Sequence, residues 1–216
     1  MINPARDEML NKVRTALQRE ADTAVSPIPA TARIAPRSIG RLDEEIDQLF
    51  AEINKLGGVT QHLANAAERQ AALVELVANE SIRKATLWQT KEIKRLGIAK
   101  ALTALGVEIV SPYADHRTVA ECDLGVTGAD FALPETGTLA LRSSSEQPRT
   151  VSLLPRVHLA IIRRSCLRAD LHQVLAEAKH DNYFVFVTGP SRTADIELTV
   201  TIGVHGPKAL QVWLME

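Results

Sequence analysis

Cysteine is scarce in this chain, which contains only Cys122 and Cys166, far apart in sequence. Two isolated cysteines exclude a disulfide scaffold and provide no CxxC pair for zinc or an iron–sulfur cluster. No HExxH or paired-histidine helix is present either, so we predict no metal site in this chain. If iron–sulfur chemistry is involved, another chain must supply the thiolates, and both cysteines are interpreted as small buried residues.

Aromatic residues and net charge are also low. Aromatics make up 4% of the chain, and 25 basic residues balance 26 acidic ones to leave a net charge of −1. Because there is no basic stripe with interleaved aromatics, nucleic acid is excluded as an expected partner. The hydrophobic content of 45% is ordinary for a globular protein, and the core must consist mostly of aliphatic side chains.

Long apolar runs are missing as well. No stretch approaches the roughly 18 apolar residues of a membrane span. The first twenty residues mix acidic and basic side chains and lack the apolar segment of a secretory signal. We therefore expect a cytoplasmic protein with no membrane span.

Proline and helical periodicity divide the chain into two parts. Pro4 follows a capping Asn3, and Met9, Val13 and Leu17 then recur on one helical face. Residues 21–40 contain three prolines and no period. The pattern predicts residues 1–40 as a helical arm with a linker, docked on its own body or on a partner, and residues 41–216 as an α/β domain.

Alternation of strands and helices sets the expected fold. Helices are predicted at residues 42–56, after a cap at Asn65, and at residues 91–105; strands are predicted at residues 59–63, 85–88 and 107–110. This rhythm favours a mainly parallel open sheet with flanking helices. Five apolar runs follow, then a helix capped by Asp170, a strand at 183–188 that is expected to be buried on both faces, and a tail of two strands around a Gly-Pro turn. The apolar runs cover residues 124–126, 131–133, 138–141, 151–154 and 157–162.

The first candidate site segment is residues 127–138, which follow an apolar run, as ligand loops of open α/β sheets do. Its glycines permit tight turns or close approach to a ligand, and its two carboxylates are candidates for acid/base or nucleophilic catalysis. Alternatively, Asp130 only caps a turn and Glu135 is solvated beside Pro134. The candidate residues are Gly128, Asp130, Glu135, Thr136, Gly137 and Thr138.

The second candidate segment, residues 188–197, resembles an anion cradle. Backbone N–H groups, two hydroxyls and a guanidinium could face a phosphate or carboxylate. Against this, Asp195 and Glu197 would repel phosphate, and Arg192 could simply neutralise Asp195. Alternatively, Asp195 is the functional group, and Arg192 orients it or a substrate carboxylate. The glycine spacing and lysine of a Walker motif are missing. The candidate residues are Gly189, Ser191, Arg192, Thr193 and Asp195.

The third candidate is His205, which stands between two glycines in a predicted turn. A turn histidine is exposed and available to a ligand, although it can also just bond its own backbone. His62, His158, His172 and His180 are interpreted as structural.

The segments GVTGADFALPETGTLAL and GPSRTADIELTVTIGVHGP occur together and in this order. Together they resemble the signature of the LUD-domain family, in the branch of lactate utilization protein C. The resemblance covers the chain from about Arg41 onward and implies a fold similar to the ribose-5-phosphate isomerase, glucosamine-6-phosphate deaminase and CoA-transferase group. The stretch from Gly128 to Asp130, followed by a Gly-Thr strand start, resembles the GAD-to-glycine-rich stretch of the sugar-phosphate isomerases. In those enzymes such carboxylates transfer protons, so the resemblance adds weight to Asp130 and Glu135. Their catalytic lysine is missing here.

The resemblance implies a non-redox component of an L-lactate utilization system, in which lactate is oxidised to pyruvate. Such a component would bind a small anionic ligand and iron–sulfur partner proteins. Two alternatives stay open: a stand-alone enzyme acting on a sugar-phosphate or acyl-CoA derivative, and an assembly protein that recruits partners through its N-terminal helix.

Overall fold

The computed structural model describes residues 4–17, 37–178, 183–193 and 201–216. The chain divides into two compact units, Met1–Ala35 and Pro36–Glu216. The smaller unit contains α1 (Pro4–Ala16), which has no buried residue and leaves Met9 and Val13 exposed. Most of the predicted linker lies outside the described residues. Within the described part of the chain, no helix is long and apolar enough to cross a membrane.

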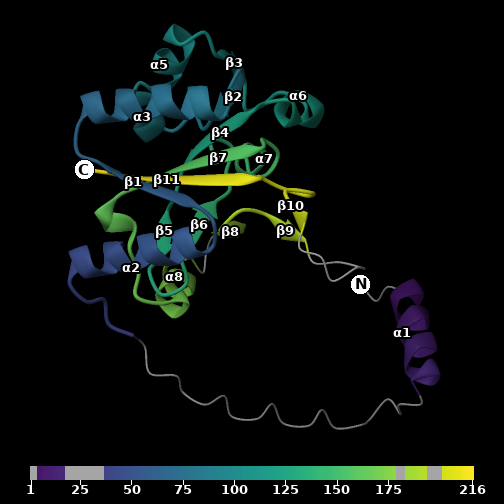
Figure 1. Cartoon of the computed structure of the whole chain (residues 1–216). Coiled ribbons are helices and arrows are strands. Elements are labelled where there is room, and N and C mark those ends of the chain that lie inside the picture. The colour runs from purple at the N-terminus through teal and green to yellow at the C-terminus, as the bar shows by residue number, and fades with distance from the viewer. Residues whose placement is uncertain (1–3, 18–36, 179–182, 194–200) are drawn as a thin grey trace. The chain divides into compact units, whose positions relative to one another are not determined.

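The larger unit is built on a six-stranded sheet in which every neighbouring pair is parallel (Figure 1). This confirms the expected α/β fold with a mainly parallel sheet. In spatial order the strands are β1 (Val59–Leu63), β11 (Ala209–Met215), β7 (Val157–Ile162), β4 (Leu124–Gly128), β2 (Lys84–Leu87) and β3 (Glu108–Val110).

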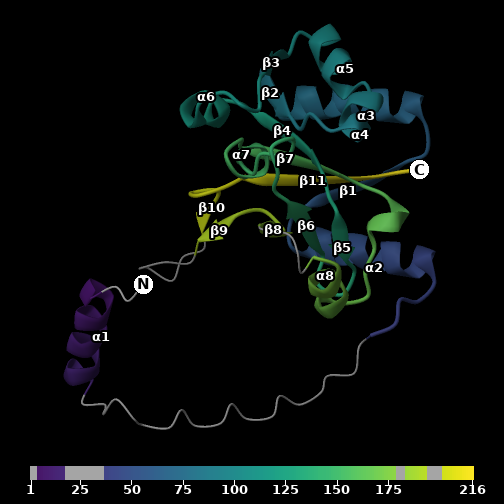
Figure 2. The same cartoon turned by 180° about the vertical axis from the view of Figure 1, so that it is seen from behind.

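Helices cover both faces of this sheet. Figures 1 and 2 show α3 (Ala66–Asn79), α4 (Lys91–Arg95) and α5 (Ile98–Ala104) on one side. The other side carries α2 (Leu42–Lys55) and α7 (Thr150–Leu153), and α6 (His116–Ala120) lies between β3 and β4 in the chain. The apolar run at residues 151–154, whose element type the sequence leaves open, contributes most of α7. One sequence expectation is corrected, because the single helix predicted at 91–105 is interrupted at Gly97, whose φ of +67° is left-handed.

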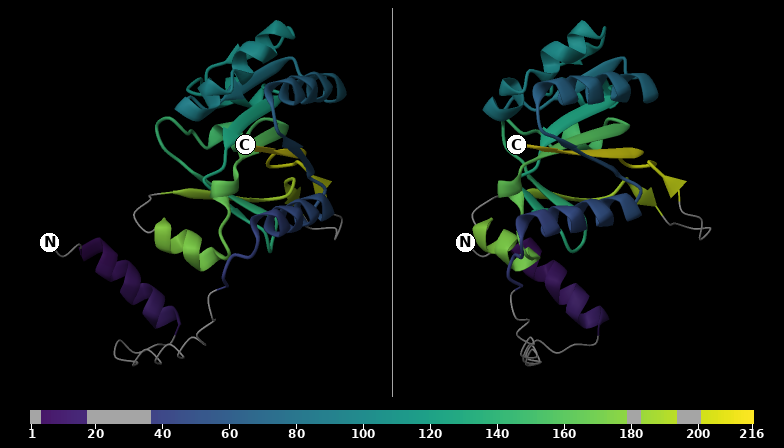
Figure 3. Two further views of the ribbon diagram at one scale, coloured as in Figure 1. Left: turned by 90° about the vertical axis from the view of Figure 1, so that its left-hand side faces the viewer. Right: turned by 60° about the vertical axis from the view of Figure 1, so that its left-hand side comes forward.

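A second, antiparallel sheet that the sequence did not predict covers part of the α2 side (Figure 3). It comprises β5 (Phe131–Leu133), β6 (Thr138–Arg142) and β8 (Phe184–Thr188), with β6 in the middle. Its outer face packs on α8 (Leu171–Glu177), and the short η1 (Arg164–Cys166) precedes that helix. The expectation that residues 183–188 are buried on both faces is wrong, because β8 is an edge strand whose residues are half-buried or exposed.

The tail contains the two predicted strands, β10 (Thr201–Ile202) and β11, on either side of the Gly-Pro turn. The two strands belong to different sheets, because β10 pairs with β9 (Arg192–Thr193) in a small antiparallel ribbon. β11 instead enters the large sheet between β1 and β7. The strand order therefore brings the last strand of the chain into the interior of the sheet.

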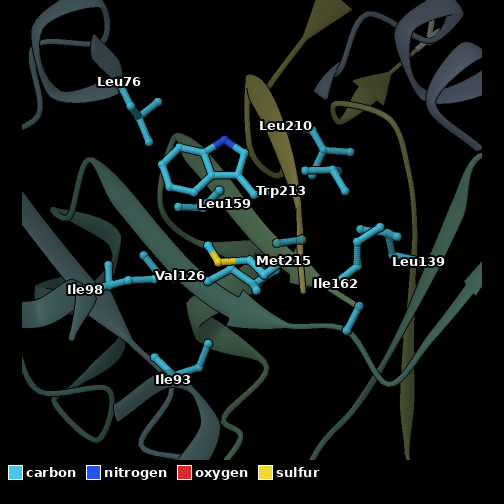
Figure 4. Packing of buried hydrophobic residues seen from close by; sticks show 14 of the residues in the cluster. Leu76, Ile93, Ile98, Val126, Leu139, Leu159, Ile162, Leu210, Trp213 and Met215 are labelled. Atoms are coloured by element: carbon cyan, nitrogen blue, oxygen red, sulfur yellow. The ribbon is translucent and has the colours of Figure 1, made fainter. Parts of the chain in front are cut away.

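The core lies on both faces of the large sheet. Figure 4 shows Trp213 of β11 beside Leu159 of β7, with Leu76 of α3 above them. Leu139 of the small sheet and Leu210 belong to the same cluster on the opposite face. Burying a large aliphatic side chain contributes ~2 kcal/mol, so this shared core stabilises the packing of the two sheets and their helices.

Two helices, α3 and α8, begin at the capping residues that the sequence predicts. The Asn65 side chain accepts hydrogen bonds from the backbone N–H groups of Ala67 and Glu68 at 3.0 Å, and the Glu68 carboxylate accepts one from the N–H of Ala64 at 2.8 Å. Asp170 likewise accepts from Gln173 N at 2.9 Å and caps α8. Both caps satisfy amides that a helix cannot pair internally.

Candidate functional site

Parts of all three predicted site segments gather where the strands of the large sheet begin, an edge we call the amino edge. The hydroxyl groups of Thr136 and Thr138 lie 2.8 Å apart, and that of Thr138 lies 2.9 Å from that of Thr188. Ser191 N donates to Pro207 O at 2.9 Å, which fixes the loop after β8 against the residues preceding β11. In Figure 1 this edge lies on the right, where β9, β10 and α7 are found.

The position of this cluster differs from the usual arrangement. Ligand loops of open α/β sheets normally follow the carboxyl ends of the strands. Here His205 comes just before β11, and Arg192 contacts Leu56, which comes just before β1. The loops that follow strands β5 and β8 of the small sheet therefore lie at the beginnings of the parallel strands of the large sheet.

Two of the candidate glycines allow the chain to pack closely against α2. Gly137 has a φ of +63°, and a Cβ there would lie 2.9 Å from Ile53 N. Gly189 has a φ of +79°, and a Cβ there would lie 2.9 Å from Leu56 Cβ. Gly128, in contrast, ends β4 at the carboxyl edge, where a Cβ would meet only ordinary contacts. The close approach that Gly137 and Gly189 permit is thus to a helix.

The two candidate catalytic carboxylates do not meet. Asp130 lies at the start of β5, where its carboxylate accepts from Arg142 N at 2.8 Å and lies 3.8 Å from Arg142 Nη1. Glu135 is exposed in the turn at the other end of β5. The structure therefore places them at opposite ends of one strand, with Asp130 held by Arg142, whose guanidinium also stacks 5.0 Å from the Phe131 ring.

A first cavity, the α8 cavity, has a volume of about 330 Å³ and lies on the outer face of the small sheet. It includes Glu135, Thr136 and Thr138 from the first predicted segment. Its remaining lining is mainly apolar and comes from Leu133, Phe186 and the residues 169–171 that begin α8.

A second cavity, the β8 cavity, has a volume of about 340 Å³ and follows β8 and the loop after it. Its exposed end carries Arg192 and His205 beside the half-buried Ser191, and its inner end is formed by buried residues of β7 and β11. Phe186 lines both cavities. The β8 cavity is lined by Ser152, Leu153, His158, residues 185–192, residues 205–207 and Leu210.

Electrostatically the β8 cavity favours an anion. Among the described residues that line it, none is a carboxylate, and Arg192 supplies a permanent positive charge. The Arg192 guanidinium donates to the carbonyl oxygen of Leu56 at the end of α2, where a cation also interacts favourably with the helix dipole. Its other N–H groups can face a ligand. Thr193 lies in β9, half-buried, and Asp195 lies outside the described residues.

The residue that the sequence interpretation missed is His158. This side chain is 1% exposed, lines the inner end of the β8 cavity, and places Nε2 2.8 Å from the hydroxyl of the fully buried Thr127. Burial lowers the pKa of His158 to about 4, so the ring is neutral near pH 7. The sequence does contain a signal for His158, which is a polar residue inside the apolar run VHLAII. A polar side chain buried in such a strand needs a hydrogen-bond partner.

The two cysteines are not activated. Cys122 is 2% exposed, and burial raises the pKa of its thiol to about 11. Burial also raises the pKa of the Cys166 thiol, whose Sγ donates to Ala129 O at 3.0 Å. Both thiols are therefore poor nucleophiles.

Within the described ranges, no group of three or more histidine, cysteine or acidic side chains could hold a metal ion.

Comparisons with known proteins agree with this architecture. A family model described as the LUD domain matches residues 46–215. Lactate utilization protein C of Shouchella clausii is 29% identical over 94% of this chain and 93% of its own length. The protein of that name from Deinococcus radiodurans is 27% identical over 96% of this chain and 94% of its own length.

A third protein of that name, from a Geobacillus species, is 30% identical and aligns over 76% of this chain and 75% of its own length. Among solved structures, a DUF162 family protein from Deinococcus radiodurans superposes with a TM-score of 0.62 and 20% identity. The match covers 83% of this chain and all of that one, and it shows that the two share a fold.

Proposed function

The chain belongs to the LUD domain family, and we propose that it is a non-redox component of an L-lactate utilization system that binds a small anionic ligand in the β8 cavity. The observation that carries this proposal is the group of Ser191, Arg192 and His205 at the exposed end of that cavity. A guanidinium with hydroxyl and backbone N–H donors is the combination that recognises carboxylates and phosphates.

The lactate utilization part of the proposal is supported by the names of the full-length relatives. The non-redox part is supported by the chemistry of the two cysteines, whose raised pKa values disfavour thiolates. The electron carriers would then be iron–sulfur partner proteins. The exposed apolar residues Met9 and Val13 of α1 are consistent with a helix that contacts such a partner.

The alternative, an enzyme acting alone on a sugar-phosphate or acyl-CoA derivative, is not favoured by the geometry. It would need Asp130 and Glu135 at one reacting centre, because a general acid or base must lie within hydrogen-bond reach of the substrate. The two residues stand at opposite ends of β5, and Asp130 is engaged by Arg142. Turnover of such a substrate by the isolated chain would revive this alternative.

The test is growth on L-lactate in a strain that depends on this gene. Arg192→Ala removes the permanent charge of the cavity and is expected to abolish that growth, with a thermal melt close to that of the wild type. Arg95→Ala, which removes an exposed arginine of α4, is the matched control and should grow normally. Wild-type growth of the Arg192 variant would refute the proposal.

A further inference from the structure

Strand β8 has one edge that no other described strand covers, because it pairs only with β6. The pairing is antiparallel, with Arg142 opposite Phe184 and a register that is unbroken as far as Thr188. One position before this register, Ser143 N donates to Tyr183 O at 3.1 Å. Bonded and non-bonded pairs alternate along an antiparallel ladder. The N–H and C=O groups of every second residue from Tyr183 onward therefore face β6, and those of the residues between them face the open edge.

Phe186 and Thr188 are the residues whose backbone groups lie on this open edge beside the β8 cavity. Both residues are exposed, and both line that cavity. Within the described part of the chain, no backbone group bonds to their N–H and C=O groups from the open side. An edge strand with accessible, unpaired backbone groups is a template on which another extended chain can pair. The cavity thus offers backbone donors and acceptors to an extended ligand.

The donors for an anion lie just beyond the end of this edge. Ser191 and Arg192 follow Thr188 after a turn, and they line the same cavity. A ligand chain that ends in a carboxylate there must therefore run parallel to β8. In a parallel ladder, a residue opposite Val187 donates its N–H to Phe186 O, and its own carbonyl accepts from Thr188 N. The carboxylate of a terminal residue takes the place of that carbonyl.

The side chain and the nitrogen of such a ligand are also restricted. A residue paired with Val187 shares its face of the sheet, so its side chain enters the β8 cavity near apolar groups such as Val187 and Leu210. Among the described residues that line the cavity, none is a carboxylate, so a free ammonium group would lack a counter-charge. At the roughly 30 Å³ that a water molecule occupies, the non-hydrogen atoms of an acetylated alanine need about 270 Å³, and the cavity has about 340 Å³.

We propose that the β8 cavity takes an N-acyl amino acid with a small apolar side chain. Its amide N–H would donate to Phe186 O, and its carboxylate would accept from Thr188 N, Ser191 and Arg192. The open edge of β8 is then the part of the site that selects an amide, and Val187 limits the size of the side chain. The inference rests on the proposed function in placing the anionic group at Arg192, and it adds the chemical class of the ligand.

The experiment is an NMR titration of the full wild-type chain with N-acetyl-L-alanine and O-acetyl-L-lactate. The two ligands share their shape and charge, and differ only in the amide N–H, which an ester oxygen replaces in the second. N-acetyl-L-alanine should bind about tenfold more tightly, the ratio expected when one hydrogen bond is lost and an oxygen faces the Phe186 carbonyl instead.

A third ligand, acetyltrialanine, presents the same amide and carboxylate as the C-terminus of a protein. Because the β8 cavity has room for only one acylated residue, the tripeptide should bind with an affinity within about tenfold of that of N-acetyl-L-alanine. A larger gain would overturn the assignment to a free acid, in favour of a chain terminus.

Two variants at one position test the contribution of the strand. Thr188→Pro removes the N–H that would donate to the carboxylate, and it leaves the ladder with β6 intact because that N–H faces the open edge. Thr188→Val keeps the N–H and is the matched control for loss of the hydroxyl, which lies 2.9 Å from that of Thr138. N-acetyl-L-alanine should bind about tenfold more weakly to the proline variant than to the valine variant.

Equal affinities of the amide and the ester, equal affinities of the two variants, or no binding of N-acetyl-L-alanine would overturn the inference. The comparison of amide and ester uses the wild type, so it decides the matter even where Thr188→Pro does not fold. Because growth on L-lactate is not measured, such a failure is distinct from a failure of the proposed function.

Discussion

At the scale of single residues, His158 is a neutral base enclosed in the core, and its protonation opposes folding. Its pKa of about 4 lies below the ~6.5 of an unfolded histidine, so the unfolded chain binds more protons between these values. This contribution favours the folded state above the unfolded pKa and diminishes as the pH falls towards the folded one. The acid sensitivity of the protein should therefore originate partly at this residue.

Removing the imidazole should remove that sensitivity. Between about pH 7 and about pH 5 the free energy of unfolding of the wild type should fall by roughly 2 kcal/mol more than that of His158→Gln. Urea unfolding at both pH values measures the difference. Parallel decreases in the two proteins would show that His158 is not the group responsible.

The residues expected at the site illustrate what sequence can and cannot specify. Hydroxyls and cations beside glycine are a chemical signal, and this signal predicts Ser191, Arg192 and His205, which line the β8 cavity. Gly137 was recognised as a special backbone position, but its reason, contact with the backbone of α2, is a property of tertiary packing. The sequence alone indicates a structural role for His158, because nothing local reveals that a cavity adjoins it.

At the scale of elements, two left-handed glycines offer a matched comparison. Gly97 has a φ of +67° between α4 and α5, and a Cβ there would meet nothing within 4 Å. Gly137 has a similar φ of +63°, but a Cβ there would lie 2.9 Å from Ile53 N. Gly97→Ala should cost about 1 kcal/mol for the left-handed conformation alone, and Gly137→Ala distinctly more. Thermal melts of the two variants test this ranking, and equal costs would contradict it.

Asp123 connects the beginnings of three strands of the large sheet. Its carboxylate accepts from Arg83 N at 2.8 Å, Lys84 N at 3.1 Å and Arg156 Nε at 3.1 Å. Partial burial, the largest single influence, raises the pKa of Asp123, but the hydrogen bonds from Arg83 and Lys84 and the Arg156 guanidinium together lower it below its ordinary value. The carboxylate therefore stabilises the fold at neutral pH, and this contribution is lost as the pH falls through that lowered pKa.

Asp123→Asn should accordingly lower the free energy of unfolding by about 1–3 kcal/mol near neutral pH, since a charged acceptor of several hydrogen bonds is lost. Glu121→Gln is the control. Its ion pair with Lys84, at 3.3 Å, is exposed and contributes little. Chemical denaturation of the two variants provides the measurement, and an equally small effect for Asp123 would contradict its role.

Most elements could be predicted from periodicity and caps, as the agreement of α2, β1 and α3 with the sequence pattern shows. The errors lie where tertiary context decides. The apolar run at residues 183–188 predicts a strand buried on both faces, whereas β8 is the edge of a small sheet beside a cavity. Strand order, and with it the choice of the amino edge for the candidate site, depends on contacts between distant segments.

At the scale of the whole molecule, the proposed boundary of the N-terminal arm at residue 40 can be tested against the structural division after residue 35. Arg37 Nη2 donates to Glu45 Oε1 at 2.8 Å, and Gly40 N donates to the same oxygen at 2.8 Å. Glu45 is only 4% exposed. The residues between the two boundaries thus contain the partners of a buried carboxylate.

Deleting residues 1–35 should leave the thermal melt unchanged, because α1 has no buried residue. Deleting residues 1–40 should lower the stability by about 3 kcal/mol, because it leaves Glu45 buried without its cation. Circular dichroism melts distinguish the two deletions. Identical melts would show that Arg37 and Gly40 do not stabilise the larger unit.

The central claim is that the β8 cavity, rather than the α8 cavity, holds the ligand. Of the two cavities, Val187 lines only the β8 cavity, and Leu171 lines only the α8 cavity. Val187→Phe and Leu171→Phe would each fill one cavity, and growth on L-lactate of strains that produce each variant in folded form is the decisive measurement. The account predicts loss of growth for Val187→Phe and normal growth for Leu171→Phe; the reverse result would contradict it.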